Sequence, residues 1–171
     1  GCAADREGAT QGSMGLAVAD YDQNGFLDIY CTHYYEESNT LYANFVDQGF
    51  RDLTALEGLH QPTLSFLGFG AIFCVLDGNN QPELLIANGH VDNGLRAAKP
   101  HMLPQLFARV HGRQWVSIGE QASSYFQRKL VGRGVATADF DGDGDLDVAI
   151  VHENDASVLL RNDSLLGNSN L

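Results

Sequence analysis

An acidic nine-residue pattern recurs three times in this chain, each time between two short apolar runs. The copies span residues 20–28, 75–83 and 139–147, and they hold 10 of the 22 acidic residues. The first and third follow the pattern Asp-x-Asp-x-(Asn/Asp)-Gly-x-x-Asp, whereas the middle copy lacks the first Asp and the Gly. Because carboxylates crowded into one turn repel each other, this clustering indicates a site for a cation.

The flanks of the acidic windows repeat as well. A Gly stands five residues before the first position of each window, and an apolar run leads into and out of each one. These runs are short, rich in β-branched and aromatic residues, and bounded by Gly, Asn and Asp, which favours strands over helices. Two further strand-like runs follow, so the repeat is 55 to 64 residues long and holds four strands. Such a period is typical of propellers and repeat arrays.

We therefore predict an all-β fold: a partial β-propeller of about three four-stranded blades, the third of them incomplete. The blade repeats of this single domain span residues 12–60, 66–120 and 130–171. The first run of each blade is apolar at successive positions, which predicts a strand buried on both faces. Helix-like patches over 54–58 and 121–126 are interpreted as connectors, and 91–103 as an extended loop.

Composition narrows the functional classes. With 171 residues, 44% of them hydrophobic, the chain can bury a core. A formal net charge of −12 argues against nucleic-acid partners and anionic membrane surfaces. The longest apolar stretch, 66–76, is too short to be inserted across a bilayer. Three Cys without a CxxC spacing indicate neither a disulfide scaffold nor a zinc ribbon.

A nine-residue turn with oxygen ligands at positions 1, 3, 5 and 9 suits Ca²⁺. Calcium takes six to eight oxygens at about 2.3–2.6 Å in irregular geometry, and the carbonyl of position 7 can add one more. Gly at position 6 allows the sharp reversal at positive φ. Mg²⁺ demands a tighter octahedron, and Zn²⁺ prefers Cys and His. An EF-hand does not fit, because position 12 is Cys31 or Ile150 instead of Glu and both flanks are strand-like.

The loops and their strands resemble FG-GAP/VCBS repeats, the calcium-binding blades of integrin-like β-propellers. The stretches 14–28, 88–91, 125–127 and 132–144 are similar to the secreted, cartilage-acidic-protein-like (ASPIC/UnbV-associated) group with this repeat. The resemblance extends over residues 12–162 and implies a seven- or eight-bladed propeller, extracellular placement and adhesive or binding roles. Because only two complete repeats fit, we expect a piece of a longer chain that supplies further blades, and association of the isolated piece through exposed sheet edges.

The resemblance also implies the calcium ligands. In the first loop they are Asp20, Asp22, Asn24, the carbonyl of Phe26, and Asp28; in the third they are Asp139, Asp141, Asp143, the carbonyl of Asp145, and Asp147. The middle loop keeps only three side-chain candidates, Asp77, Asn79 and Glu83. We expect a weak or empty site there.

The function predicted from these features is a calcium-stabilised, non-enzymatic binding or adhesion module, secreted or at the cell surface, with a protein or carbohydrate ligand. The alternative is the scaffold portion of a calcium-dependent polysaccharide-acting enzyme, for which His90 and Arg133 would be the residues to test. The sequence has no recognisable nucleophile elbow, HExxH motif or Ser/His/Asp arrangement. Cys31 and Cys74 are interpreted as inert buried thiols, and Asn162 begins a glycosylation sequon.

Overall fold

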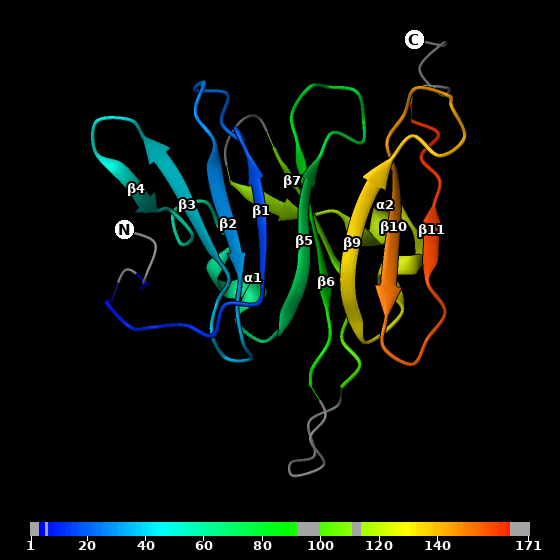
Figure 1. Ribbon diagram of the computed structural model, residues 1–171, viewed down its shortest axis with the longest axis horizontal. Helices are drawn as coiled ribbons and strands as arrows, with labels where there is room; N and C mark the ends of the chain where they lie inside the picture. Colours follow the sequence, from blue (N-terminus) through cyan, green and yellow to red (C-terminus); the bar gives the residue numbers. More distant parts are fainter. Residues whose placement is uncertain (1–3, 6, 92–99, 111–113, 165–171) are drawn as a thin grey trace.

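The chain folds into three antiparallel β-sheets. The computed structural model describes residues 4–5, 7–91, 100–110 and 114–164. The sheets have four, four and three strands, and within each sheet the strands pair in chain order. Figure 1 shows the three sheets following one another across the molecule. The prediction of an all-β fold is therefore confirmed.

The strands coincide with the predicted apolar runs. The first sheet contains β1 (Gly15–Ala19), β2 (Asp28–Thr32), β3 (Thr40–Phe45) and β4 (Gly49–Asp52). The second contains β5 (Gly68–Cys74), β6 (Glu83–Asn88), β7 (Gln105–Arg109) and β8 (Trp115–Ser117). The third contains β9 (Gly132–Ala138), β10 (Asp147–His152) and β11 (Val158–Leu160). The three strands described in the third sheet agree with the prediction that the third repeat is incomplete. Residues 165–171 of this repeat lie outside the described part.

Short helices occupy the two connectors between sheets. They are α1 (His60–Thr63), α2 (Gly119–Ala122) and the 3-10 helix η1 (Ser124–Gln127). The patch over 54–58 lies in a connector, as predicted, but it is not helical: it forms turns that end at Gly58, whose φ is +81°, and α1 follows it. The patch over 121–126 falls on α2 and η1. In the described ranges no helix has the length and apolar character needed to cross a membrane. Of the extended loop predicted over 91–103, residues 92–99 lie outside the described ranges.

The core consists of two apolar layers, one on each face of the second sheet. Successive side chains of a strand point to opposite faces. In β6, Leu84 and Ile86 therefore join the layer shared with the first sheet, and Leu85 and Ala87 join the layer shared with the third. Each fully buried Leu or Ile stabilises the fold by about 2 kcal/mol. The second strand of the central sheet is thus buried on both faces along its whole length.

The prediction that the first strand of each sheet is buried on both faces is wrong for the two outer sheets, whereas in β5 Phe73 packs on one layer and Ile72 on the other. In β1, Ala17 is buried in the layer shared with the second sheet, but Leu16 and Val18 are 64% and 53% exposed. On the third sheet, Val151 and Leu159 are similarly exposed. The cause is the position of these sheets: among the described residues, each has a neighbouring sheet on one side only.

Glycine lets the first strands of neighbouring sheets approach each other. Strand β1 contacts β5, and β5 contacts β9. A Cβ atom on Gly15 would lie 2.0 Å from the carbonyl oxygen of Phe69, and one on Gly70 would lie 2.9 Å from the backbone nitrogen of Val135. Any side chain would therefore collide with the adjacent strand. The Gly that precedes each acidic window serves this contact in the first two repeats.

Candidate metal centres

Each acidic window connects the first strand of a sheet to the second. The windows join β1 to β2, β5 to β6 and β9 to β10. Because all three first strands run in the same direction, the three loops lie at one end of the molecule, uppermost in Figure 1. The repeated sequence pattern therefore corresponds to a repeated position in the fold.

The loop backbones share one conformation. Positions 4 and 6 have positive φ in all three loops: 60° and 91° at Gln23 and Gly25, 70° and 62° at Gly78 and Asn80, and 78° and 98° at Gly142 and Gly144. The positive φ predicted at position 6 is confirmed. The second reversal, at position 4, was missed, although Gly at this position in two of the loops was a signal for it.

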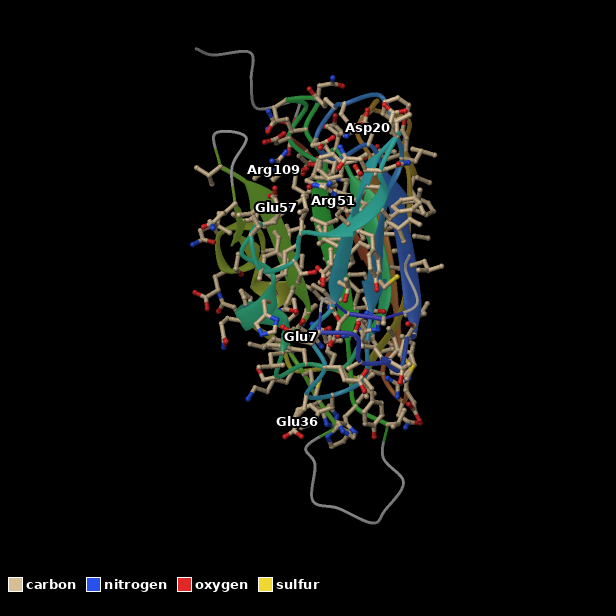
Figure 2. The ribbon with its side chains drawn as sticks, turned by 90° about the vertical axis from the view of Figure 1, so that its left-hand side faces the viewer. Glu7, Asp20, Glu36, Arg51, Glu57 and Arg109 are labelled. Carbon is tan, nitrogen blue, oxygen red and sulfur yellow. The ribbon has the colours of Figure 1, made fainter. Side chains whose placement is uncertain are left out.

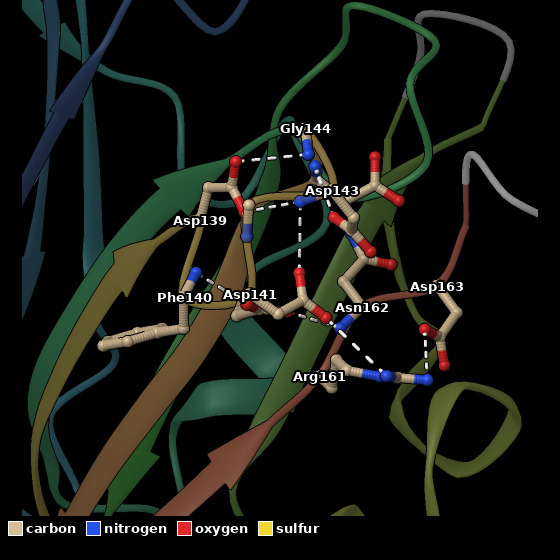
Figure 3. Close-up of polar contacts among 11 residues, drawn as sticks. Asp139, Phe140, Asp141, Asp143, Gly144, Arg161, Asn162 and Asp163 are labelled. Carbon is tan, nitrogen blue, oxygen red and sulfur yellow. Dashed lines mark hydrogen bonds and ion pairs between the residues drawn. The ribbon is translucent and has the colours of Figure 1, made fainter.

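The first carboxylate of each complete loop binds the backbone of its own turn. The Oδ2 atom of Asp20 accepts the N–H of Gly25 at 2.8 Å, and the Oδ2 atom of Asp139 accepts the N–H of Gly144 at 3.1 Å (Figure 3). Hydrogen bonds from backbone amides fix these carboxylates inside the turn. The same bonds orient the turn around them.

The last carboxylate of each complete loop connects the loop to two strands. Asp28 and Asp147 are both almost fully buried. One oxygen of each accepts the N–H of position 2, at 3.1 Å in the first loop and 2.9 Å in the third. The other oxygen accepts the N–H of Asn44 at 2.7 Å or of Asn162 at 2.8 Å. Position 9 therefore holds the loop to β3 in the first sheet and to the segment just after β11 in the third, a role that the sequence pattern did not predict.

Three carboxylates converge in each complete loop. Their oxygens lie within 4.8 Å of one another in two triads, Asp20, Asp22 and Asp28, and Asp139, Asp141 and Asp147. Two oxygens that bind one calcium ion at about 2.4 Å lie at most about 4.8 Å apart, so each triad fits a single ion. The Oδ2 atom of Asp143 is shielded from solvent and has no hydrogen-bond partner among the described residues, which fits a cation at this position. The structure therefore contains two acidic groups that can hold a metal ion.

Position 5 also uses its side chain within the turn. The Oδ1 atom of Asn24 accepts the N–H of Phe26 at 2.8 Å, and that of Asp143 accepts the N–H of Asp145 at 2.9 Å. These bonds place the backbone of position 7 next to the side chain of position 5. The carbonyls of Phe26 and Asp145 as ligands remain a prediction.

The carboxylates differ in electrostatics. Burial raises the pKa of Asp28, and the other acids of its loop add to the rise. By contrast, the N–H groups that bind Asp147, that of Asn162 above all, hold its pKa below the usual value. Burial and the neighbouring Asp143 raise the pKa of Asp141. A cation between these groups would lower the cost of keeping them ionised.

A cationic side chain lies beside the third loop. The Nη1 atom of Arg161 is 3.7 Å from Asp141, and its Nη2 atom is 2.8 Å from Asp163 (Figure 3). The pairing of strands places Ala43 at the equivalent position of the first sheet. The two complete loops therefore differ in their charged surroundings as well as in their acids.

Position 2 of the first loop packs onto the second sheet. Tyr21 is buried, with its ring centroid 5.9 Å from that of Trp115, and Arg109 lies over it at 5.0 Å. The Nε atom of Arg109 lies 3.7 Å from Glu57, and Figure 2 shows the two side by side. Burial raises the pKa of Glu57 and of Tyr21. The sequence pattern did not predict this anchoring of the loop, because the residues that contact Tyr21 are far from it in the sequence.

The middle loop has the same turn with fewer acids. Asp77 accepts the N–H of Asn79 at 3.0 Å, and Glu83 accepts the N–H of Leu76 at 2.7 Å. Glu83 is almost fully buried, and burial raises its pKa to about 7. Val75 brings no carboxylate to position 1. The weak site predicted at Asp77, Asn79 and Glu83 remains a prediction.

The residues proposed for the enzyme alternative have packing contacts. The Nδ1 atom of His90 donates to the carbonyl of Val91 at 2.7 Å, and its ring lies 5.4 Å from that of Tyr35. Arg133 lies 4.2 Å over the ring of Phe69 and forms an ion pair with Glu153. A catalytic role for His90 or Arg133 remains a prediction.

The remaining predicted features are also placed. Cys31 and Cys74 are both buried, and burial raises the pKa of Cys74 to about 12. The side-chain nitrogen of Asn162 donates to the carbonyl of Leu76 at 2.7 Å, and its Oδ1 accepts the hydroxyl of Ser164 at 2.6 Å. The nitrogen to which a glycan would be attached is therefore engaged between two sheets.

Two comparisons with known proteins were without a match. No protein-family model matches the chain, and no curated protein matches it.

Proposed function

We propose that this chain is a calcium-stabilised, non-enzymatic binding module that forms an arc of a β-propeller. The observation that carries the proposal is the recurrence of one loop at one junction of each sheet, with a carboxylate triad in two of the three copies. Ca²⁺ in these loops would neutralise the acids and fix each first strand to its second. The fixed loops would then present a constant surface to a partner.

Calcium is the ion that this chemistry favours. The candidate ligands are the carboxylate, amide and carbonyl oxygens already described, and the turns hold no His or Cys. Oxygen ligands on an irregular turn suit a cation that accepts six to eight ligands at variable distances. Zn²⁺ would favour nitrogen and sulfur ligands, and Mg²⁺ a stricter octahedron.

The packing of position 2 supports a propeller with further blades. In the first two loops this side chain, Tyr21 or Leu76, packs against the next sheet. Its counterpart in the third loop, Phe140, is 54% exposed. An apolar side chain of this size at an otherwise repeated contact is what a further sheet would cover. The resemblance to FG-GAP/VCBS repeats supports the same arrangement.

The loop end is the surface that we assign to partner binding. An open hollow of about 600 Å³ lies among the three loops and is lined by Asp20, Gln23, Val75, Asn80 and Leu146. Millimolar calcium outside cells matches the affinity of extracellular sites, about 10⁻⁴ to 10⁻³ M. We therefore place the module outside the cell, with a protein or carbohydrate ligand, as the resemblance implies.

Calorimetric titration of the chelator-treated chain with CaCl₂ tests this proposal. We expect two calcium ions per chain, a higher melting temperature with calcium, and little heat from the same titration with MgCl₂. A chain that binds no calcium up to several millimolar, with an unchanged melting temperature, would falsify the calcium proposal.

A further inference from the structure

A cavity lies between the second and third sheets, next to the middle acidic loop. Its volume is about 240 Å³. The buried side chains of Leu85, Phe126 and Val148 form its apolar wall, and the exposed Asp77 lies at its outer part. Glu83 also lines it, and this residue is only 3% exposed. The cavity therefore combines an apolar interior with a buried acid.

The charges around the cavity favour a cationic ligand. Glu83 accepts the N–H of Leu76, but within the described ranges it forms no ion pair with a basic side chain. Arg161 also lines the cavity, yet its guanidinium is paired with Asp141 and Asp163. A buried carboxylate without a cation nearby is unfavourable, and an ammonium group beside it removes that cost.

We propose that this cavity binds a small primary ammonium compound whose apolar part is about the size of one ring. The size follows from the volume, since an apolar cavity of about 150 Å³ already accommodates benzene. The ammonium group would pair with Glu83, and the apolar part would lie against Phe126 and Leu85. None of the carboxylates in the two acidic triads lines this cavity.

Three probes with one shared ring test the proposal on the full chain in excess calcium. Benzylamine, benzyl alcohol and benzoate are titrated while amide resonances are followed by NMR. We expect saturable shifts at Leu76, Glu83 and Val148, and about tenfold tighter binding of benzylamine than of benzyl alcohol, because a hydrogen bond to a charged group is stronger than a neutral one. Benzoate should not bind. Equal binding of the three probes, or shifts scattered over the surface, would overturn the proposal.

Matched variants locate the site. Glu83→Gln keeps the shape and removes the charge, so the preference for benzylamine should disappear. Ala122→Phe adds a ring at an exposed position that lines the cavity, and it should abolish binding of both neutral and cationic probes. Glu120→Gln removes an exposed acid of the same helix that does not line the cavity, and it should leave the affinity unchanged.

The variants also separate this site from a metal site. If Glu83→Gln does not fold, Ala122→Phe alone decides, and unchanged binding to that variant refutes the proposal. Benzylamine binding that is present with chelator and lost with calcium would identify Glu83 as a metal ligand and would equally refute it.

Discussion

The side-chain amide of Asn162 donates a hydrogen bond to the backbone carbonyl of Leu76 at 2.7 Å, which joins the third sheet to the middle loop of the second. Arg109 makes the equivalent contact one sheet earlier, from its Nη1 atom to the carbonyl of Tyr21 at 3.4 Å. Arg109 is the last residue of β7 and Asn162 lies two residues after β11, and each contacts position 2 of the acidic loop in the preceding sheet. Neighbouring sheets are therefore connected by a repeated polar contact as well as by their apolar layers.

Replacing Asn162 should weaken this connection. We expect Asn162→Ala to lower the free energy of unfolding by about 1–2 kcal/mol, because the partly buried carbonyl of Leu76 loses its donor. Urea denaturation measures the change. Asp163→Ala is the control: it removes only an exposed ion pair with Arg161 and should cost at most about 0.5 kcal/mol. Equal losses in the two variants would contradict a special role for Asn162.

The third loop should account for one of two bound calcium ions. We expect Asp139→Asn to reduce the calorimetric stoichiometry from two to one, because the variant keeps an acceptor for the loop amides but loses a charge from the triad. Asp77→Asn, in the middle loop, should leave two ions bound. A stoichiometry that follows Asp77 instead of Asp139 would show that the ligands are assigned to the wrong loops.

The first loop should bind calcium more weakly than the third, because Asn24 stands where the third loop has Asp143. We expect Asn24→Asp to raise the affinity of the first site about threefold to tenfold, since affinity increases with the number of ligand charges. The same variant should melt at a lower temperature in chelator, because a fourth carboxylate adds repulsion. Higher stability in chelator would contradict this account.

Glu83 should make the stability of the chain depend on pH. Its pKa is raised from 4.5 to about 7 by burial, so the folded state keeps a proton that the unfolded state releases. The folded state therefore loses stability as the pH rises from about 4.5 to 7, by about 2–3 kcal/mol in total, and loses no more above that range. We expect Glu83→Gln to lack this loss and to be the more stable protein at pH 8. Denaturation of both proteins in chelator from pH 4.5 to 8 gives the difference, and parallel curves would contradict the assignment.

The exposed apolar faces of the outer sheets should cause self-association. We expect the double variant Leu16→Gln, Leu159→Gln to elute from a sizing column closer to the monomer than the unchanged chain, because each position is more than half exposed on an open sheet face. Leu56→Gln changes a residue that is 69% exposed in a connector, and it should have no effect. A compact monomer already in the unchanged chain would contradict the expectation that the open faces associate.

The strands were predictable because their signals are local. Short β-branched runs between Gly, Asn and Asp residues located all three sheets, and the spacing of Asp20, Asp22 and Asp28 located a carboxylate triad that the structure also brings together. Burial was not predictable in the same way. Leu16 and Leu84 are both apolar strand residues, but among the described residues only Leu84 faces a neighbouring sheet. Which strand face is covered by another sheet depends on the tertiary packing and not on the local sequence.

The contacts that complete the candidate sites join distant segments. The N–H of Asn44 binds Asp28 across the first sheet, and Arg109 binds Tyr21 from the second. No periodicity or spacing within one loop specifies such partners, because they depend on strand register and on the packing of one sheet against the next. The sequence therefore predicted the acids of each site better than the groups that hold them in place.

The close contact between Gly15 and Phe69 brings the first strands of two neighbouring sheets together. The sheets nearly touch along their first strands, whereas Trp115 and Leu59 fill the space farther out, so each pair of sheets forms a wedge. The curvature of the whole assembly thus follows from small residues at the narrow side and large ones at the wide side. Protein engineers seeking a smaller or larger angle between these sheets would alter those two sets of positions and could leave the acidic turns untouched.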